Sequence, residues 1–215
     1  MIKKIFVFGD SIVQGSNDWT GGGWVVRLKN YFSQTGQFHH IFNLGISGEN
    51  SSHIISRMEV EIKPRKSEDR NKKSLLIVGI PINDTRIKDK LDGDPEISIA
   101  RFKANLEELY SIGKKNSNEL VFLGMTKVDE EKTNPWQEVV DRRIVCWRND
   151  VIEKYNDIIK KYCDEKNIYF INMIDLLKNS DLSDGLHPNE VGHNKMYERI
   201  RDFLIEKKLI KKLNS

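Results

Sequence analysis

Two segments near opposite ends of the chain carry residue types that can perform acyl transfer. A serine follows an apolar run in Gly9-Asp-Ser-Ile12, and Asp184 and His187 stand three residues apart far downstream. A serine hydroxyl becomes a good nucleophile when a neighbouring base takes its proton, and histidine can be that base. A carboxylate can accept the other imidazole N–H and hold the ring in one tautomer. We therefore expect Ser11 to be the nucleophile, His187 the base and Asp184 the residue that orients it.

The same chemistry needs hydrogen-bond donors for the oxygen that becomes negative in the tetrahedral intermediate. Candidates are the backbone N–H groups of Ser11 and of Gly45, in Asn43-Leu-Gly-Ile-Ser-Gly48, and the side-chain amide of Asn83, in Pro81-Ile-Asn-Asp84. One such donor lowers the barrier of a comparable hydrolase by about 3–4 kcal/mol. We expect Ser11, Gly45 and Asn83 to form an oxyanion hole.

Short apolar runs alternate with longer segments of helical period, and this alternation would bring the polar segments together. The apolar runs are Ile5–Phe8, Ile41–Leu44, Leu75–Ile80, Leu120–Leu123 and Ile168–Ile171. Several lack alternating polar residues, which is typical of strands covered on both faces. Five strands separated by helices predict an α/β fold, a three-layer α/β/α sandwich around a five-stranded parallel sheet. The loops beyond the carboxyl ends of such strands carry the functional residues.

Apolar spacing of three and four residues predicts the main helices. The residues with this spacing are Trp24, Leu28 and Tyr31; Val140, Ile144, Trp147, Val151, Tyr155, Ile158 and Tyr162; and Met196, Ile200 and Phe203. We see no internal repeat or linker that would divide the chain, so residues 1–215 are expected to form a single domain.

Charge and composition exclude several other classes of protein. The chain has 35 basic and 32 acidic residues, a net charge of +3, with 31% charged and 38% hydrophobic residues. This balance argues against a disordered chain and against a polybasic nucleic-acid binder. No apolar run approaches the roughly 20 residues that span a bilayer, and the first run stops at Gly9, which is too short for a signal peptide.

The two cysteines, Cys146 and Cys163, imply no disulfide framework, and no histidine or cysteine has a partner at metal-ligand spacing. We therefore expect a cytoplasmic protein with no metal or other cofactor, no membrane span and no nucleic-acid partner. Its expected partner is a small-molecule ester, and its oligomeric state is not readable from the sequence.

Each candidate residue also has a structural interpretation. Ser11 could cap the following helix, His187 with its proline could open the last one, and Gly45 could serve a tight turn. Asp181 competes with Asp184 as the orienting carboxylate, and His193 is expected at the surface or at the rim of the site. For the whole chain, the alternative is a non-catalytic small-molecule-binding domain. A nucleotide-binding domain is disfavoured, since the segment after the first strand lacks G-x-G-x-x-G.

Taken in order, the segments G-D-S, N-L-G-x-S-G, N-D and D-x-x-H-P resemble the sequence blocks of the GDSL lipase/esterase family, also called SGNH hydrolases. The resemblance runs from Gly9 to the last predicted helix, and the name-giving residues would be Ser11, Gly45, Asn83 and His187. It implies a flavodoxin-like sandwich, no metal, and hydrolysis of esters or thioesters through a seryl acyl-enzyme. Substrates in this family include acetylated sugars, lysophospholipids, acyl-CoA thioesters and aryl esters.

The chain departs from the family pattern at two positions. Ile12 replaces the usual leucine, and the third block begins with Pro81 where the family usually has glycine. Because proline has no N–H and fixes φ near −65°, the loop that carries Asn83 is expected to follow a different path. If the chain is a non-catalytic domain, Pro81 is the departure from the family pattern that would indicate it.

The segment from Thr126 to Trp136, after the fourth apolar run, is long for a connection. Long loops at the functional edge of a sheet are often lids or pocket walls. We expect this loop to bound the acyl or alcohol pocket, with Trp136 as a substrate-binding residue.

Overall fold

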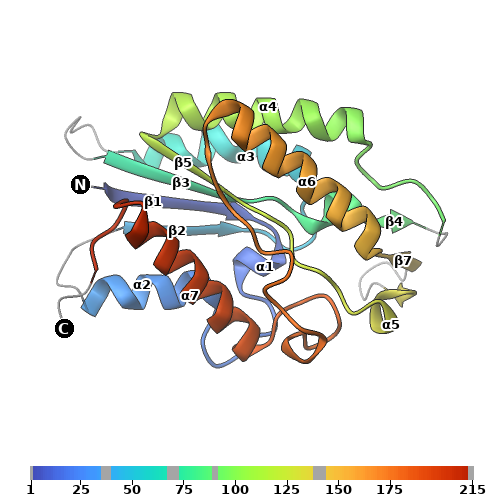
Figure 1. Cartoon of the computed structure of the whole chain (residues 1–215). Coiled ribbons are helices and arrows are strands. Elements are labelled where there is room, and N and C mark those ends of the chain that lie inside the picture. Colours follow the sequence, from blue (N-terminus) through green and yellow to red (C-terminus); the bar gives the residue numbers. More distant parts are fainter. Residues whose placement is uncertain (1, 35–39, 67–72, 89–91, 138–143, 213–215) are drawn as a thin grey trace.

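Five parallel strands form the central sheet of the computed structural model, which describes residues 2–34, 40–66, 73–88, 92–137 and 144–212 (Figure 1). The strands are β1 (Ile2–Gly9), β2 (His40–Gly45), β3 (Lys73–Gly79), β5 (Glu119–Leu123) and β8 (Tyr169–Ile171). Their order across the sheet is β2-β1-β3-β5-β8. The predicted strands are all present, with bounds that differ by one to three residues.

Helices cover both faces of this sheet. They are α2 (Gly23–Gln34), α3 (Ser51–Ile62), α4 (Ile99–Asn116), α6 (Asn149–Lys166) and α7 (Glu190–Glu206). Helices α2 and α7 pack together on one face, while α3, α4 and α6 cover the other (Figure 1). The side chains of Ile5 to Phe8, which alternate between the two faces, are consequently all fully buried. This is the predicted three-layer α/β/α sandwich.

Polar residues set the starts of these helices. Asn50 accepts a hydrogen bond from the His53 N–H at the start of α3, and Ser98 accepts one from Arg101 N–H at the start of α4. Asn189 caps α7 by accepting the Gly192 N–H. Such caps satisfy N–H groups that have no acceptor within the helix. They fix the point at which each loop from the sheet becomes a helix.

Short elements occupy the carboxyl edge of the sheet. They are α1 (Ser11–Gln14), α5 (Glu130–Thr133), and the 3-10 turns η2 (Ile82–Thr85) and η3 (Asn179–Asp181). The 3-10 turn η1 (Lys63–Arg65) lies at the opposite edge, where Lys4 of β1 donates to the Arg65 carbonyl. Three further strands, β4 (Ile87–Lys88), β7 (Ile144–Cys146) and β6 (Trp136–Gln137), form a small antiparallel sheet in the order β4-β7-β6. Sequence analysis did not predict this second sheet.

The long helix expected from Val140 is wrong in its first part. Val140 lies outside the described residues, Ile144 belongs to β7, and the helix begins only at Asn149. The backbone around Ile144 pairs with β4 on one side and β6 on the other. The Trp147 N–H donates to Asn134 Oδ1 instead of to a helical carbonyl. These tertiary hydrogen bonds override an apolar spacing that continues the helical period.

The strand order contains a reversal between β1 and β3. The chain leaves β1 toward β2 on one side and crosses back to β3 on the other, so the loops after β1 and β3 diverge. Crevices at such switch points are the usual ligand sites of open α/β sheets. The loops that contain Ser11 and Asn83 follow β1 and β3 directly.

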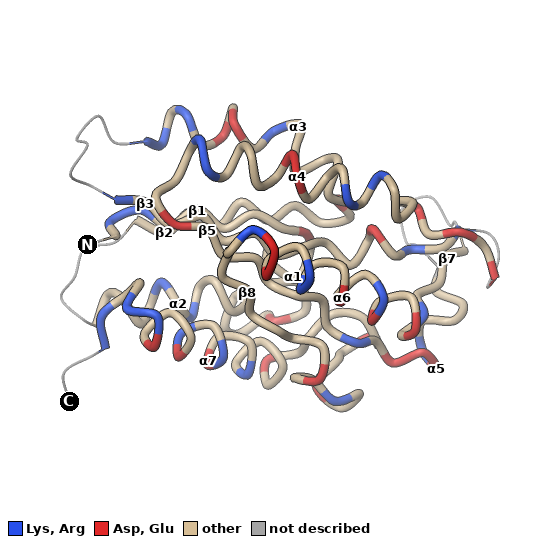
Figure 2. The backbone as a smooth tube through the Cα atoms, turned by 45° about the horizontal axis from the view of Figure 1, so that its top comes forward, with Lys and Arg blue, Asp and Glu red and all other residues tan. Residues whose placement is uncertain are grey.

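Charged residues of both signs are interspersed along the outer helices, while the inner strands carry few of them (Figure 2). Among the described residues, no helix has the length and apolar content needed to cross a bilayer.

Candidate active site

Ser11, His187 and Asp184 form a continuous chain of hydrogen bonds. The His187 Nδ1 atom lies 2.7 Å from Asp184 Oδ2, and its Nε2 atom lies 2.8 Å from Ser11 Oγ. A carboxylate oxygen can only accept from the ring, so Nδ1 carries the proton and Nε2 accepts from the serine hydroxyl. This is the tautomer that general-base activation of a serine requires.

The Asp184 carboxylate is held by its own turn. Its Oδ1 atom accepts the Leu186 N–H at 3.0 Å and the His187 N–H at 2.8 Å. Partial burial raises the pKa of Asp184, but the hydrogen bonds and charge of His187 together with these N–H groups outweigh it and lower the pKa to about 2. Asp184 therefore remains ionised while the imidazole acquires and releases a proton.

The competing carboxylate, Asp181, faces away from this chain of hydrogen bonds. It accepts the Lys178 N–H at 2.9 Å and lies 2.6 Å from Lys195 Nζ. Asp181 therefore anchors the start of the turn to α7. His193 is also displaced from its expected place, because it is fully buried on α7 instead of lying at the surface or the rim.

Ser11 stands at the start of a single helical turn that lies close against the sheet. Asp10 caps α1, and a Cβ atom on Gly9 would lie only 2.2 Å from Val13 Cγ2. Glycine at position 9 thus lets α1 pack directly on the strand ends. Ser11 is the first residue of α1, so its N–H has no acceptor within the helix.

The Asp10 carboxylate joins the first and third loops. One oxygen accepts the Ile12 N–H at 3.0 Å, and the other accepts the Ile82 N–H at 3.1 Å. Burial raises the pKa of Asp10, with these hydrogen bonds and the charge of His187 acting in the opposite direction. Pro81 has φ −64° and caps the 3-10 turn η2, in which Asn83 lies. The proline therefore leads into the turn, and its neighbour supplies the N–H that Asp10 binds.

Asp84 binds the third loop to α3. Its Oδ1 atom accepts the Ser51 N–H at 2.8 Å, and its buried Oδ2 atom has no partner among the described residues. Burial, with contributions from Asp10 and Glu96, raises the pKa of Asp84 to about 7 against the effect of the Ser51 hydrogen bonds.

The predicted oxyanion donors differ in their availability. Asn83 Nδ2 donates to the Glu49 carbonyl at 3.0 Å, which uses one of its two N–H groups. The Gly45 N–H, in contrast, already donates to Asn43 Oδ1 at 3.1 Å. A Cβ atom at position 45 would lie 2.4 Å from the Gln14 nitrogen. The absence of a side chain at Gly45 therefore allows β2 to pack closely on α1, while its expected oxyanion role stays a prediction.

The next glycine of the second block, Gly48, lies beside Asn83. Its peptide precedes Glu49, whose carbonyl Asn83 binds, and its φ is +80° with open space around the Cα. Its N–H has no acceptor among the described residues. Arg57 holds this loop by donating to the Leu44 carbonyl at 2.7 Å and to the Glu49 carboxylate. Sequence analysis missed Gly48, although the block contains two glycines.

Trp136 lies directly beside His187. Its ring centroid is 6.0 Å from that of His187 in an edge-on arrangement, and 5.9 Å from that of Trp147. The end of the long loop therefore reaches the site through β6.

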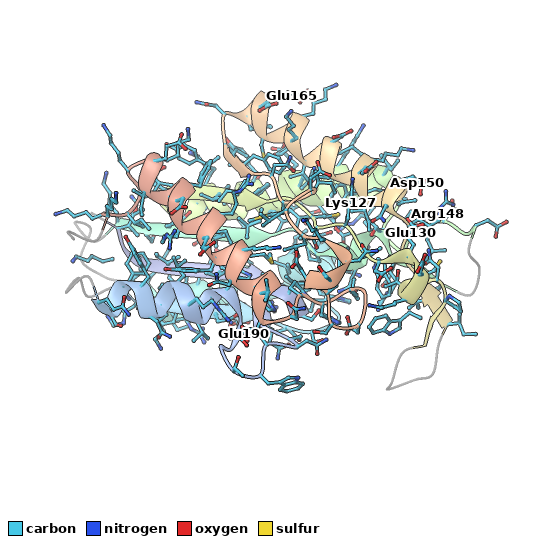
Figure 3. The ribbon with its side chains drawn as sticks, turned by 60° about the horizontal axis from the view of Figure 1, so that its bottom comes forward. Lys127, Glu130, Arg148, Asp150, Glu165 and Glu190 are labelled. Carbon is cyan, nitrogen blue, oxygen red and sulfur yellow. The ribbon has the colours of Figure 1, made fainter. Side chains whose placement is uncertain are left out.

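Figure 3 shows the charged residues around the start of α6, where Arg148 and Asp150 form an ion pair and Glu130 accepts the Asn149 N–H.

One contact to the Asp184 carboxylate was not predicted. Asn17 Nδ2 donates to Asp184 Oδ2 at 2.7 Å, from the loop between α1 and α2. Sequence spacing cannot predict a hydrogen bond between two residues that lie 167 positions apart.

Comparison with known proteins assigns the chain to a family. The sequence profile of the GDSL-like lipase/acylhydrolase family matches residues 7–195. The chain belongs to this family. A GDSL esterase/lipase of Arabidopsis thaliana is 22% identical over 215 residues, covering 96% of this chain and 87% of the plant protein. Membership makes the protein a carboxylic ester hydrolase.

Solved structures show the same fold for this GDSL-family chain. Axe2, an acetylxylan esterase from Geobacillus stearothermophilus, matches with a TM-score of 0.71 and 16% identity, covering 99% of this chain and 97% of that one. LAE5, an α/β hydrolase from the metagenome of Lake Arreo in Spain, matches with a TM-score of 0.70 and 18% identity over the same shares. At these identities the likeness concerns the fold alone.

The buried Asp84 carboxyl makes stability depend on pH. Its folded pKa of about 7 lies above the unfolded value of 3.8, so its proton favours the folded state. That contribution is complete below about pH 4 and is lost as the pH rises through 7. Asp84→Asn has no proton to lose, so its unfolding free energy should not fall in this way. Measured relative to the wild type, the unfolding free energy of the variant should rise by roughly 4 kcal/mol between pH 4 and pH 8. Urea unfolding across this range measures the difference.

The control for Asp84 is Asp157→Asn, which changes an exposed carboxyl on α6. The difference in unfolding free energy between this control and the wild type should not change with pH. An equally flat difference for Asp84→Asn would contradict the assignment of a retained proton.

Proposed function

We propose that this ester hydrolase is a serine esterase that cleaves a carboxylic ester of a small molecule through a seryl acyl-enzyme. The observation that carries the proposal is the hydrogen-bonded chain from Ser11 Oγ to His187 at 2.8 Å and on to Asp184 at 2.7 Å. A thioester would react through the same steps, because both substrates pass through a tetrahedral intermediate with a negative oxygen.

In the first half of the reaction, Ser11 Oγ attacks the ester carbonyl carbon as His187 Nε2 takes the hydroxyl proton. The imidazolium that forms is stabilised by Asp184, which keeps its negative charge. The tetrahedral intermediate then breaks the bond to the alcohol, whose oxygen receives the proton from His187. The acyl group remains on Ser11.

In the second half, a water molecule takes the place of the alcohol. His187 Nε2 removes a proton from this water as its oxygen attacks the acyl carbon, and the proton passes to Ser11 Oγ when the acid leaves. The same base and the same donors serve both halves, so no cofactor is needed.

The oxyanion donors in this proposal are the Ser11 N–H, the Gly48 N–H and the second N–H of Asn83. They come from the three loops that follow β1, β2 and β3. Asp10 joins the first of these loops to the third, and Asn83 joins the third to the second. The donors are thus held in place before substrate binds, which is what makes such a site effective.

Trp136 is proposed as one wall of the acyl or alcohol pocket because its ring lies edge-on to the His187 ring. An acetylated saccharide is one ester that fits the proposal, and Axe2, which shares the fold, is an acetylxylan esterase. The alternative is a non-catalytic binding domain on the same fold. A hydroxyl, imidazole and carboxylate in hydrogen-bond contact favour the catalytic function.

Ser11→Ala should abolish hydrolysis of p-nitrophenyl acetate, since the covalent intermediate cannot form. A drop in kcat of about 10⁴-fold or more is expected. Mass spectrometry after treatment with a fluorophosphonate should place the label on Ser11 in the wild type and find none in the variant. A wild type that neither turns over esters nor takes up the label would favour the binding-domain alternative.

Asn83→Ala should lower kcat for p-nitrophenyl acetate by about 100-fold, because an oxyanion donor acts mainly in the transition state. KM should change little, and a parallel measurement of the melting temperature separates catalysis from loss of the Glu49 contact. An unchanged kcat in a stably folded variant would remove Asn83 from the oxyanion hole.

Trp136→Ala should raise KM for p-nitrophenyl octanoate much more than for the acetate, because only the longer chain buries apolar surface against the indole. Steady-state kinetics with the acetate, butyrate and octanoate esters tests this. Trp19→Ala is the control, since the Trp19 side chain is 89% exposed. Equal changes in KM across the three esters would show that Trp136 does not line the pocket.

A further inference from the structure

The loop between α1 and α2 reaches the catalytic carboxylate. Asn17 Nδ2 lies 2.7 Å from Asp184 Oδ2, the same oxygen that accepts the His187 Nδ1–H. We propose that Asn17 is a positioning residue, whose side-chain amide fixes the Asp184 carboxylate against the imidazole and ties it to the nucleophile's segment. This inference rests on the proposed function and adds a residue to its machinery.

The Asn17 bond differs in kind from the other bonds of the carboxylate. Two N–H groups of the local turn, from Leu186 and His187, hold Oδ1. Among the described residues, Asn17 is the one donor to Asp184 from outside that turn. Asn17 also lies only six residues after Ser11. Its amide therefore connects the acid and base to the stretch of chain that carries the nucleophile.

The backbone of Asn17 is specialised for this contact. Its φ is +66°, in the left-handed region that few side chains other than asparagine and aspartate tolerate. The residue follows Gly15, which ends α1 with φ +100°. Two left-handed residues within three positions turn the chain sharply, and this turn directs the Asn17 side chain toward Asp184.

The loop around Asn17 is held on both sides. On one side, the Ser16 carbonyl lies 3.0 Å from His193 Nε2, which must carry the proton because a carbonyl only accepts. Burial lowers the pKa of His193, opposed by the Ser16 bond, so the ring stays neutral. A fully buried side chain on α7 thus anchors the residue before Asn17.

On the other side, the buried Asp18 carboxylate accepts the N–H groups of Gly21 at 2.9 Å and Gly23 at 3.0 Å and pairs with Arg27. Arg27 also reaches the Glu190 carbonyl at 3.4 Å, at the start of α7, where Figure 3 shows Glu190 beside this loop. The glycines after Trp19 therefore close a turn around a carboxylate. Asn17 stands between two fixed neighbours and needs little reordering to bind Asp184.

The contact has an electrostatic consequence as well as a geometric one. An N–H that donates to Asp184 draws negative charge away from the oxygen that faces His187, which weakens the attraction for a protonated ring. Aspartate at position 17 would do the reverse, since a second carboxylate favours the imidazolium. The other ionisable groups that interact with His187 are Asp10, after β1, and His193, on α7, and both stay in place in such a variant.

The test compares Asn17→Gly with Asn17→Asp. Glycine keeps the left-handed backbone and removes the amide, while aspartate keeps the shape and replaces the donor with a charge. For p-nitrophenyl acetate, Asn17→Gly should lower kcat about tenfold with KM within twofold of the wild type. Asn17→Asp should also move the acidic limb of kcat/KM to higher pH, by about half a unit or more.

The matched control is Asn167→Gly. Asn167 also has a left-handed backbone, with φ +51°, but it ends α6 just before β8, at the edge of the sheet opposite the carboxyl ends of the strands. It should leave kcat, KM and the pH profile within error of the wild type. Equal kcat in Asn17→Gly and the control, with an unmoved acidic limb in Asn17→Asp, would overturn the proposal.

Proton NMR gives a readout that does not depend on turnover. The His187 Nδ1–H bonded to Asp184 should give a low-field signal, which Asn17→Gly should shift or broaden and Asn167→Gly should not. If the wild type cleaves no ester yet this signal responds to Asn17→Gly, the proposed function fails while the positioning role stands. If the wild type cleaves esters but Asn17→Gly changes neither this signal nor kcat, the proposed function stands and the positioning role of Asn17 fails.

Discussion

The arrangement of the site depends on one buried carboxylate, that of Asp10. The loops after β1 and β3 leave the sheet in divergent directions, and Asp10 binds an N–H from each of them. A buried carboxylate is costly unless its oxygens are hydrogen-bonded, so both loops are constrained to supply their N–H groups. Because Asp10 also caps α1, any displacement of Asn83's turn relative to Ser11 would break one of these bonds.

Ser11, His187 and Asp184 are brought together by one local and one long-range arrangement of the chain. Asp184 and His187 lie within a single turn, which supplies two N–H groups to the carboxylate, while Asn17 adds one from a distant loop. Ser11 reaches them from 176 positions away. That contact depends on α1 lying close against the strand ends, and the absence of a side chain at Gly9 and Gly45 allows this approach.

Much of the architecture was predictable from the sequence because its signals are local. Apolar runs such as Ile5–Phe8 are buried on both faces, and the resemblance of four blocks to GDSL enzymes is supported by the family match. The spacing of Asp184 and His187 corresponds to a real turn, and Trp136 lies beside the site, although their roles remain predictions.

The features that sequence analysis missed arise from tertiary contacts. Ile144 continues a helical spacing yet belongs to β7, which pairs with β4 on one side and with β6 on the other. The Gly45 N–H is an exception, because its acceptor, Asn43 Oδ1, lies only two residues away in the sequence. His193 and Asn17 are polar residues whose partners lie more than 160 positions away, and a single sequence gives no sign of such pairs.

The distance in sequence between Ser11 and His187 has a consequence during synthesis. Ser11 is made 176 residues before His187, and β8, at the edge of the sheet, is made between them. A nascent chain that has completed four of the five strands presents a serine hydroxyl without a base. A translation product that stops before His187 therefore lacks the base that the proposed reaction requires.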